Sequence, residues 1–217
     1  MKFLDLLFPP YCVACRSDLG EYDQFDAVCD TCFLRVREAG HQFKKLSPID
    51  RVVFYAPYQD PVIRILIHHF KYRGVKGLAA PLAELGCRAL EEAGVSRLWS
   101  KQKPVITFIP LHPLRERLRG YNQSALLAHE AGEHFSLPVL PLARRVALTP
   151  AQAVIDNPKD RRANIKNAFE LLVSRAPQKI ILVDDVFTSG STLKEAGRML
   201  RKGGAKTIWA ITAAGKS

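Results

Sequence analysis

The sequence predicts an α/β protein with a parallel sheet covered by helices on both faces, preceded by a small cysteine-bearing module. From about residue 46 onward, short apolar runs alternate with stretches of helical periodicity. Strands that alternate with helices form parallel sheets whose two faces are both buried. Residues 11–45, by contrast, are polar and hold two Cys-x-x-Cys pairs. We therefore expect two domains, residues 1–45 and residues 46–217.

The elements of the larger domain follow in order from these patterns. Apolar runs ended by proline predict strands, and apolar residues at helical spacing predict helices. The expected strands are residues 52–55, 105–109, 180–183 and 207–211, and the expected helices are residues 62–70, 78–93, 122–134 and 191–202. Gly203 and Gly204 should end the last helix. Residues 149–167 lack apolar periodicity, which predicts a mobile loop with a functional role.

The charge of the chain limits its partners. Its 32 basic and 21 acidic residues leave a net charge of +11, which favours a polyanion, either a nucleic acid or a polyphosphate metabolite. The first ten residues contain apolar side chains, but Asp5 interrupts the run and Pro9 and Pro10 end it. The run is too short for a secretory signal or a membrane span. We therefore expect a cytoplasmic protein with no membrane span.

The most informative segment is residues 180–192, where an apolar strand leads into two carboxylates and a hydroxyl-rich turn. Ligands of parallel sheets bind beyond the carboxyl ends of the strands, and the next helix offers its N-terminal N–H groups to a phosphate. Glycine lets the backbone approach an anion, while carboxylates accept from sugar hydroxyls or hold a hydrated Mg²⁺. The candidate ligands of a phosphorylated sugar are Asp184, Asp185, Thr188, Ser189, Gly190, Ser191 and Thr192.

This segment has two other readings. The acidic pair and the hydroxyls would also suit a turn in which they only cap the helix. A Walker A loop is excluded, because its Gly-x-x-x-x-Gly-Lys-Ser/Thr pattern is missing.

The two Cys-x-x-Cys pairs, formed by Cys12, Cys15, Cys29 and Cys32, predict a structural zinc site. In a reducing compartment such pairs favour a metal over disulfides. Four thiolates complete the tetrahedral shell that Zn²⁺ prefers and leave no open position for catalysis, and their spacing suits a zinc ribbon or knuckle. The alternative is four reduced cysteines without a metal. Cys87 stands apart and is expected to be a buried apolar residue.

Several short motifs are spread along the chain. They are the two Cys-x-x-Cys pairs, Lys71-Tyr72, residues 119–123 (RGYNQ), 149–152 (TPAQ), 161–164 (RRAN), Ala168-Phe169 and the segment 180–192. Together they resemble the ComF competence family (ComFC-like proteins), within the type I phosphoribosyltransferases. The resemblance implies a type I phosphoribosyltransferase fold that binds 5-phosphoribosyl 1-pyrophosphate (PRPP) with Mg²⁺ through residues 184–192.

The same resemblance implies two further loops. Residues 110–120 would be the pyrophosphate loop, and residues 149–167 would be the flexible loop that closes over the site. Guanidinium groups bind phosphate bidentately, which makes Arg115, Arg117 and Arg119 the candidates for pyrophosphate. Their alternative role is a solvated charged face. No general base is evident, and three histidines are candidates only by position: His68, His69 and His112.

Two functions from different classes compete. The family resemblance implies a PRPP-binding protein in DNA uptake during natural transformation, with single-stranded DNA and DNA-uptake proteins such as a competence helicase as partners. The alternative is an active phosphoribosyltransferase with an unidentified acceptor. No acceptor-binding pattern is evident in residues 74–103 or after Ile211, so the sequence leaves catalysis open. A nucleic-acid-binding regulator on the same fold is a third reading.

Overall fold

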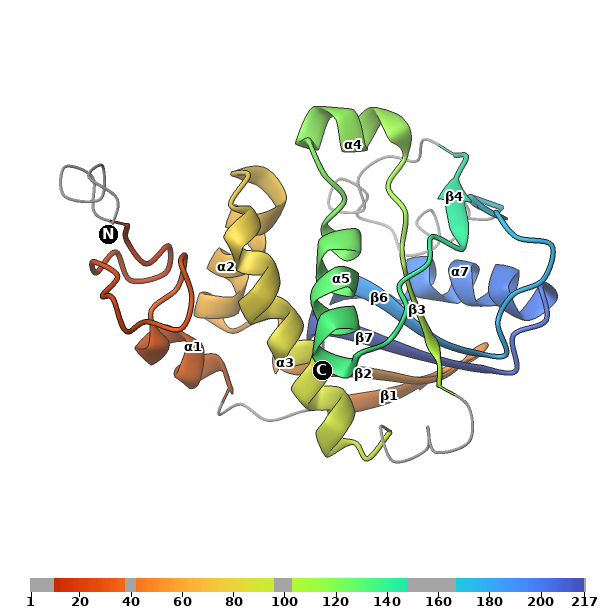
Figure 1. The fold of residues 1–217 in the computed structure, drawn as a ribbon, viewed down its shortest axis with the longest axis horizontal. Coiled ribbons are helices and arrows are strands. Elements are labelled where there is room, and N and C mark those ends of the chain that lie inside the picture. Colours follow the sequence, from red (N-terminus) through yellow and green to blue (C-terminus); the bar gives the residue numbers. More distant parts are fainter. Residues whose placement is uncertain (1–9, 38–41, 96–102, 148–166, 217) are drawn as a thin grey trace.

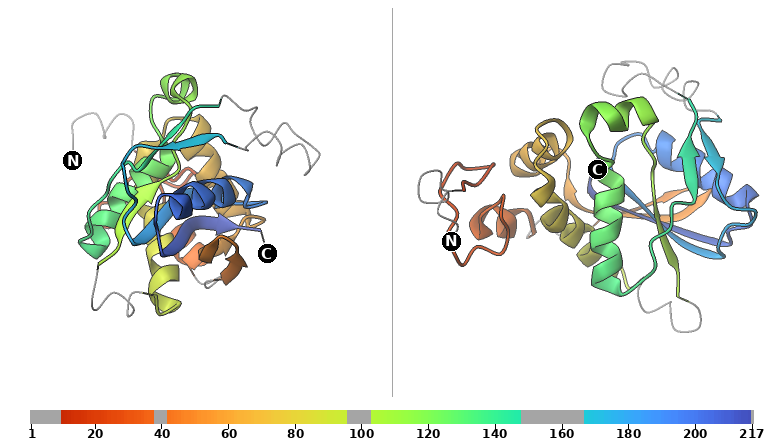
Figure 2. Two further views of the ribbon diagram at one scale, coloured as in Figure 1. Left: turned by 90° about the vertical axis from the view of Figure 1, so that its right-hand side faces the viewer. Right: turned by 45° about the horizontal axis from the view of Figure 1, so that its top comes forward.

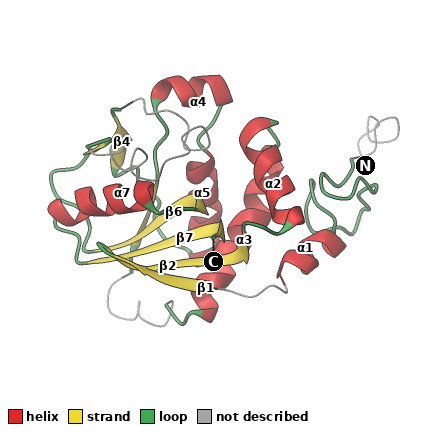
Figure 3. Ribbon diagram, turned by 180° about the vertical axis from the view of Figure 1, so that it is seen from behind, coloured by secondary structure: helices red, strands yellow, loops and turns green. Residues whose placement is uncertain are grey.

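The computed structural model describes residues 10–37, 42–95, 103–147 and 167–216. Its centre is a five-stranded sheet with the strand order β1-β2-β7-β6-β3. Figure 3 shows β1, β2, β7 and β6 side by side in this sheet. These strands are β1 (Gln42–Leu46), β2 (Ile49–Pro57), β3 (Val105–Phe108), β6 (Lys179–Phe187) and β7 (Thr207–Gly215). β2, β7, β6 and β3 run parallel, and β1 joins the edge antiparallel to β2. The prediction of a mostly parallel α/β sheet is confirmed.

Helices cover both faces of the sheet (Figure 1). The helices are α1 (Asp30–Arg37), α2 (Pro61–Tyr72), α3 (Ala79–Glu92), α4 (Pro113–Arg119), α5 (Gln123–Phe135) and α7 (Ser191–Lys202), with a 3-10 turn η2 (Lys76–Leu78) before α3. α3 and α5 pack on one face of the sheet, while α7 and a small antiparallel pair, β4 (Ala143–Arg145) with β5 (Phe169–Leu171), cover the other. Figure 2 shows this pair lying beside α7.

The alternation of side chains along β6 explains the two layers. Ile181 and Val183 are buried in one apolar cluster together with α3 and α5. Ile180 and Leu182 are buried in the other cluster, together with α7. Successive side chains of a strand point to opposite faces, so an uninterrupted apolar run marks a strand that is covered on both sides.

Side-chain caps fix where two of the site-forming helices begin. Asp60 accepts hydrogen bonds from the backbone N–H groups of Val62 and Ile63, at 2.8 and 3.0 Å, at the start of α2. Asn122 caps α5 by accepting from Ser124 N at 3.0 Å, and its Nδ2 donates to Ile109 O at 3.1 Å. Asn122 therefore ties the start of α5 to the chain that leaves β3.

The cysteine-bearing module packs against α2 and α3. Phe33 of α1 belongs to the same apolar cluster as Leu66 of α2, and Gln24 Nε2 donates to Glu84 Oε2 of α3 at 2.9 Å. β1 spans the expected boundary at residue 45, which itself stays a prediction. Cys87 is buried, as expected. In the described part of the chain, no helix is long and apolar enough to cross a membrane.

Candidate functional site

A cavity of about 340 Å³ opens at the carboxyl ends of the parallel strands. Its walls come from the last turns of α2, the chain through α4, the start of α5, the end of β6 and the start of α7. The volume lies within the usual range for small-molecule sites. The cavity therefore brings together segments that are far apart in the sequence.

Most of the predicted phosphate loop lines this cavity. Thr188, Gly190, Ser191 and Thr192 are lining residues, whereas Ser189 is exposed and contributes no wall. Ser189 Oγ instead lies 2.7 Å from Ser191 Oγ. The N-cap of α7 is a glycine and supplies no side-chain hydrogen bond, so it leaves the positive end of the helix dipole open to an anion.

Gly190 is required by its surroundings as well as by its backbone. Its φ of +69° lies in the left-handed region, where glycine is favoured. A Cβ at this position would lie 2.8 Å from Phe187 Cε2 and 3.0 Å from both Leu46 methyl carbons. The turn that begins α7 is therefore held tightly against the ends of β6 and β1.

The acidic pair lies at the end of β6, and both carboxylates line the cavity. Asp184 Oδ1 accepts from Ser124 Oγ at 3.0 Å and from Asp185 N at 2.9 Å. Burial and the neighbouring Asp185 carboxylate raise the pKa of Asp184 to about 7, against the attraction of Lys71. Two carboxylates this close suit a ligand that brings positive charge or hydroxyl donors.

Lys71, from the last turn of α2, balances part of that negative charge. Its Nζ lies 2.7 Å from Asp185 Oδ1, and both side chains are mostly buried. Burial works against the ammonium, but the Asp185 carboxylate, with smaller contributions from Asp184 and Tyr72, outweighs it, so the pKa of Lys71 is raised. Lys71 stands in a motif that the sequence analysis noted, yet its pairing with Asp185 was not predicted.

Arginines gather on another wall of the cavity. Arg115 and Arg119 line it, whereas Arg117 is exposed and does not. Arg119 NH1 donates to Gln123 Oε1 at 2.5 Å. Burial and the Arg119 charge lower the pKa of Arg115, which reflects positive charges held close together. Of the three predicted arginines, the fold thus brings two to the cavity.

Arg145 of β4 is a cavity residue that the sequence analysis missed. It is buried and lines the cavity, and its Cζ lies 5.5 Å from the centroid of the Phe169 ring. Burial and the charge of Arg115 lower the pKa of Arg145. The signal in the sequence was its place just before the predicted functional loop at residues 149–167, with whose basic residues it can be grouped.

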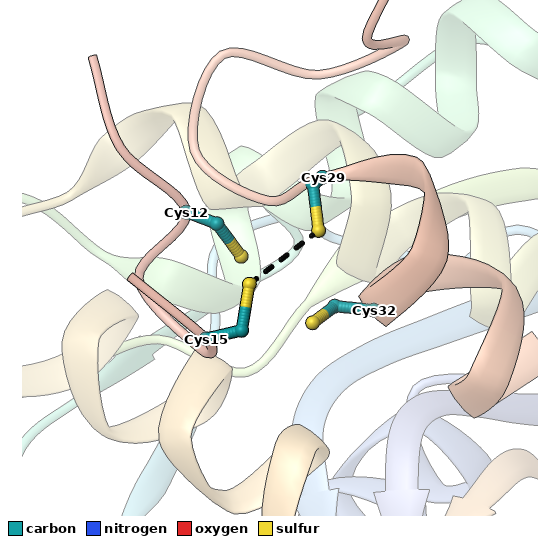
Figure 4. Close-up of side chains that lie close together, drawn as sticks. All are labelled: Cys12, Cys15, Cys29 and Cys32. Carbon is teal, nitrogen blue, oxygen red and sulfur yellow. Dashed lines mark hydrogen bonds between the residues drawn. The ribbon is translucent and has the colours of Figure 1, made fainter. Parts of the chain in front are cut away.

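The four paired cysteines converge as predicted (Figure 4). Their Sγ atoms all lie within 4.8 Å of one another, and Cys15 Sγ is 3.7 Å from Cys29 Sγ. Around a tetrahedral Zn²⁺ with bonds of about 2.3 Å, sulfur atoms would be about 3.8 Å apart. The first pair lies in a tight turn in which Arg16 N donates to Cys12 O, and the second lies at the start of α1. The donor set therefore fits a structural zinc ion.

Comparison with known proteins then decides the family. The phosphoribosyl transferase domain model matches residues 142–217. Competence protein F of Haemophilus influenzae is 34% identical over 211 residues, which cover 94% of this chain and 85% of that protein. DNA utilization protein YhgH of Salmonella typhi is 31% identical, over 94% of this chain and 96% of its own length. The chain belongs to the ComF competence protein family.

Solved structures also match this ComF family member. Adenine phosphoribosyltransferase from Saccharomyces cerevisiae matches with a TM-score of 0.40 and 13% identity, covering 84% of this chain and 88% of that one. The orotate phosphoribosyltransferase from Aeropyrum pernix matches with a TM-score of 0.36 and 14% identity, covering 84% of this chain and 92% of that one.

The remaining residues predicted from the sequence of this ComF family member lie in different places. His68 lines the cavity, whereas His69 Nδ1 contacts Ile65 O and His112 Nδ1 accepts from Leu114 N at the start of α4. The predicted flexible loop, residues 149–167, lies outside the described residues except for its last one. The described end of that loop is fixed, because Asn167 N donates to Glu195 Oε1 at 2.7 Å.

Proposed function

We propose that this chain binds PRPP in the cavity and acts in DNA uptake or handling during natural transformation. The observation that carries the proposal is the meeting of the hydroxyl-lined start of α7, the acidic pair and an arginine wall in one cavity. The matched phosphoribosyl transferase domain and the family's competence proteins support it.

Each part of PRPP finds chemistry suited to it. The 5-phosphate would bind at the start of α7, where Thr188, Ser191 and Thr192 add hydroxyl donors. The ribose hydroxyls would donate hydrogen bonds to Asp184 and Asp185. The pyrophosphate would lie toward the arginine wall, where guanidinium groups bind phosphate oxygens.

A magnesium ion would accompany the ligand. Asp184 and Asp185 offer the carboxylate oxygens that Mg²⁺ prefers, and they would hold it through its water shell together with the phosphate oxygens. Bound there, the ion would supply positive charge to the pyrophosphate. The cysteine cluster would hold Zn²⁺ as a structural ion, and reduced thiolates at that site support a cytoplasmic setting.

Isothermal titration calorimetry with PRPP and Mg²⁺ tests the assignment. Asp184→Asn with Asp185→Asn replaces two carboxyl groups by neutral amides. A hydrogen bond to a charged group contributes about 1 kcal/mol more than one to a neutral group, so affinity should fall at least tenfold. Glu21→Gln with Asp26→Asn makes the same charge change on exposed residues of the cysteine-bearing module. Equal affinities for a folded double variant and this control would refute the assignment.

An active phosphoribosyltransferase is the second candidate function. The bond from the anomeric carbon to pyrophosphate would break as an acceptor attacks, and the arginine wall would stabilise the leaving pyrophosphate. The crowding of Arg115 and Arg145 favours this reading. Release of pyrophosphate from PRPP, measured with bases, amines and single-stranded DNA as acceptors, separates it from ligand binding alone.

Single-stranded DNA is the proposed macromolecular partner. The net charge of +11 exceeds what one small ligand needs, and contacts between basic residues and phosphates release counterions. Binding should therefore weaken steeply as salt rises. Fluorescence anisotropy with a labelled oligonucleotide would contradict this if the affinity did not change with salt.

A further inference from the structure

An aromatic ring stands exposed at the mouth of the cavity. Tyr72, the last residue of α2, lines the cavity and yet keeps 59% of its surface in solvent. His68, one turn earlier, also lines the cavity, and its ring centroid lies 5.2 Å from that of Tyr72. The two rings belong to one end of α2, so they mark the rim of the cavity next to Lys71.

A guanidinium group completes this rim. Arg119 Cζ lies 5.4 Å from the centroid of the Tyr72 ring, in cation–π geometry. On its other side, Arg119 NH1 donates to Gln123 Oε1 at 2.5 Å. Arg119 is therefore held from two elements, α2 and α5, and its planar group lies at a fixed place beside the ring.

Gln123 adds a second, independent sign of a ligand. Its side chain is 1% exposed and lines the cavity. Its Nε2 is a buried donor that makes no hydrogen bond of ordinary geometry with the described residues, although the Gln123 side chain also interacts with the Tyr121 hydroxyl. A buried donor without a well-placed partner is unfavourable, so a further acceptor would improve the hydrogen bonding of this corner.

We infer that Tyr72 and Arg119 form a stacking subsite for a nucleobase at the mouth of the cavity, positioned by Gln123. Flat π-faces stack on exposed aromatic rings and on guanidinium planes, and every base has such a face. The subsite adds a ligand class to the proposed function. It rests on that proposal only in taking PRPP as the occupant of the inner cavity. Its ligand is a purine or pyrimidine ring, carried by a free nucleoside or by a single strand.

The position of the subsite fits such a ligand. Lys71 precedes Tyr72 and its Nζ contacts Asp185 Oδ1 at 2.7 Å, so the stacking rim adjoins the acidic end of the inner cavity. Arg117 and Leu118 extend α4 into solvent beside Arg119, and Leu118 is 90% exposed. A strand whose base stacks on Tyr72 would thus meet further cationic and apolar surface outside the cavity.

Quenching of 2-aminopurine fluorescence tests the stacking directly, because the emission of this base falls when it stacks. The probes are 2-aminopurine riboside and a short single-stranded dT oligonucleotide with one internal 2-aminopurine. Tyr72→Leu should weaken binding about tenfold and remove the quenching, since stacking on an aromatic side chain supplies much of the affinity for a base. Tyr72→Phe keeps the ring and should restore both.

Tyr22→Leu is the matched control, because Tyr22 is 94% exposed in the cysteine-bearing module and outside the cavity. Quenching of the oligonucleotide alone assigns the base to a single strand, and quenching of the riboside assigns it to a free nucleoside. Equal quenching by the Tyr72→Leu and Tyr22→Leu proteins, or none by the unaltered chain, overturns the subsite. Calorimetry with PRPP on the same unaltered protein keeps the two proposals apart: quenching through Tyr72 without PRPP binding overturns the proposed function and leaves the subsite standing.

Discussion

Lys71 Nζ lies 2.7 Å from Asp185 Oδ1, and this ion pair joins the last turn of α2 to the end of β6. The side chains keep only 19% and 14% of their surfaces in solvent. A pair in such surroundings is screened far less than a surface pair. Lys71 therefore both fixes α2 against the sheet and neutralises a carboxylate at the proposed ligand site.

A double-mutant cycle should measure this coupling. With Lys71→Met, Asp185→Asn and the double variant, we expect a coupling of about 1 to 3 kcal/mol in the free energy of unfolding. The control cycle uses Arg144 and Glu170, a 2.6 Å pair whose side chains are 65% and 49% exposed, for which we expect less than about 1 kcal/mol. Urea unfolding gives both values, and a weaker coupling for the Lys71 pair would contradict its structural role.

Neighbouring arginines of α4 should differ in their effect on anion binding. Arg115 lines the cavity and Arg117 does not, although the sequence presents them alike. Arg115→Ala should lower the affinity for inorganic pyrophosphate about tenfold, the size of one lost charge-assisted interaction. Arg117→Ala removes the same charge and should change it less than about twofold. Equal affinities of the two variants in calorimetric titrations would mean that pyrophosphate binds away from Arg115.

The cysteine cluster should retain one zinc ion per chain. Four sulfur atoms within 4.8 Å fit a tetrahedral shell, and removal of one ligand should release the metal and loosen the turns that carry the cysteines, because metal binding contributes to the folding of such sites. Metal analysis after purification under reducing conditions should give one zinc for the unaltered chain and less for Cys29→Ser. Cys87→Ser, which changes a buried cysteine outside the cluster, should keep it. Equal zinc in both variants argues against the site.

Gly190 should tolerate alanine less well than Gly74 does. Both have a positive φ, +69° and +71°, but an added Cβ meets Phe187 and Leu46 at Gly190 and nothing within 4 Å at Gly74. Gly74→Ala should therefore show backbone strain alone, about 1 to 2 kcal/mol. Gly190→Ala should add an overpacking penalty of about 1 to 3 kcal/mol. Thermal unfolding compares the stability of the two variants. Equal losses of stability would mean that the turn before α7 can shift to accommodate the added methyl group.

Much of the fold was predictable because it depends on local patterns. The apolar runs at β2, β3, β6 and β7 have the lengths typical of strands. Apolar residues at helical spacing predicted α2, α3, α5 and α7. The structure extends β6 to Phe187, so the acidic pair is part of the strand rather than the residues after it. β1, with the sequence QFKKL, was missed, because a polar edge strand with one exposed and one buried apolar side chain has no clear alternation.

The sequence by itself determined the chemistry that this chain carries: a thiolate set for zinc, and a strand, acidic pair and hydroxyl turn suited to a phosphorylated sugar. Those features lie in contiguous segments, where residue type and spacing are sufficient. Only the tertiary structure decided that Lys71 reaches Asp185, that Arg145 enters the cavity and that Arg117 stays outside it. Such contacts join residues far apart in the chain, and they depend on how helices and strands pack, which no local periodicity records.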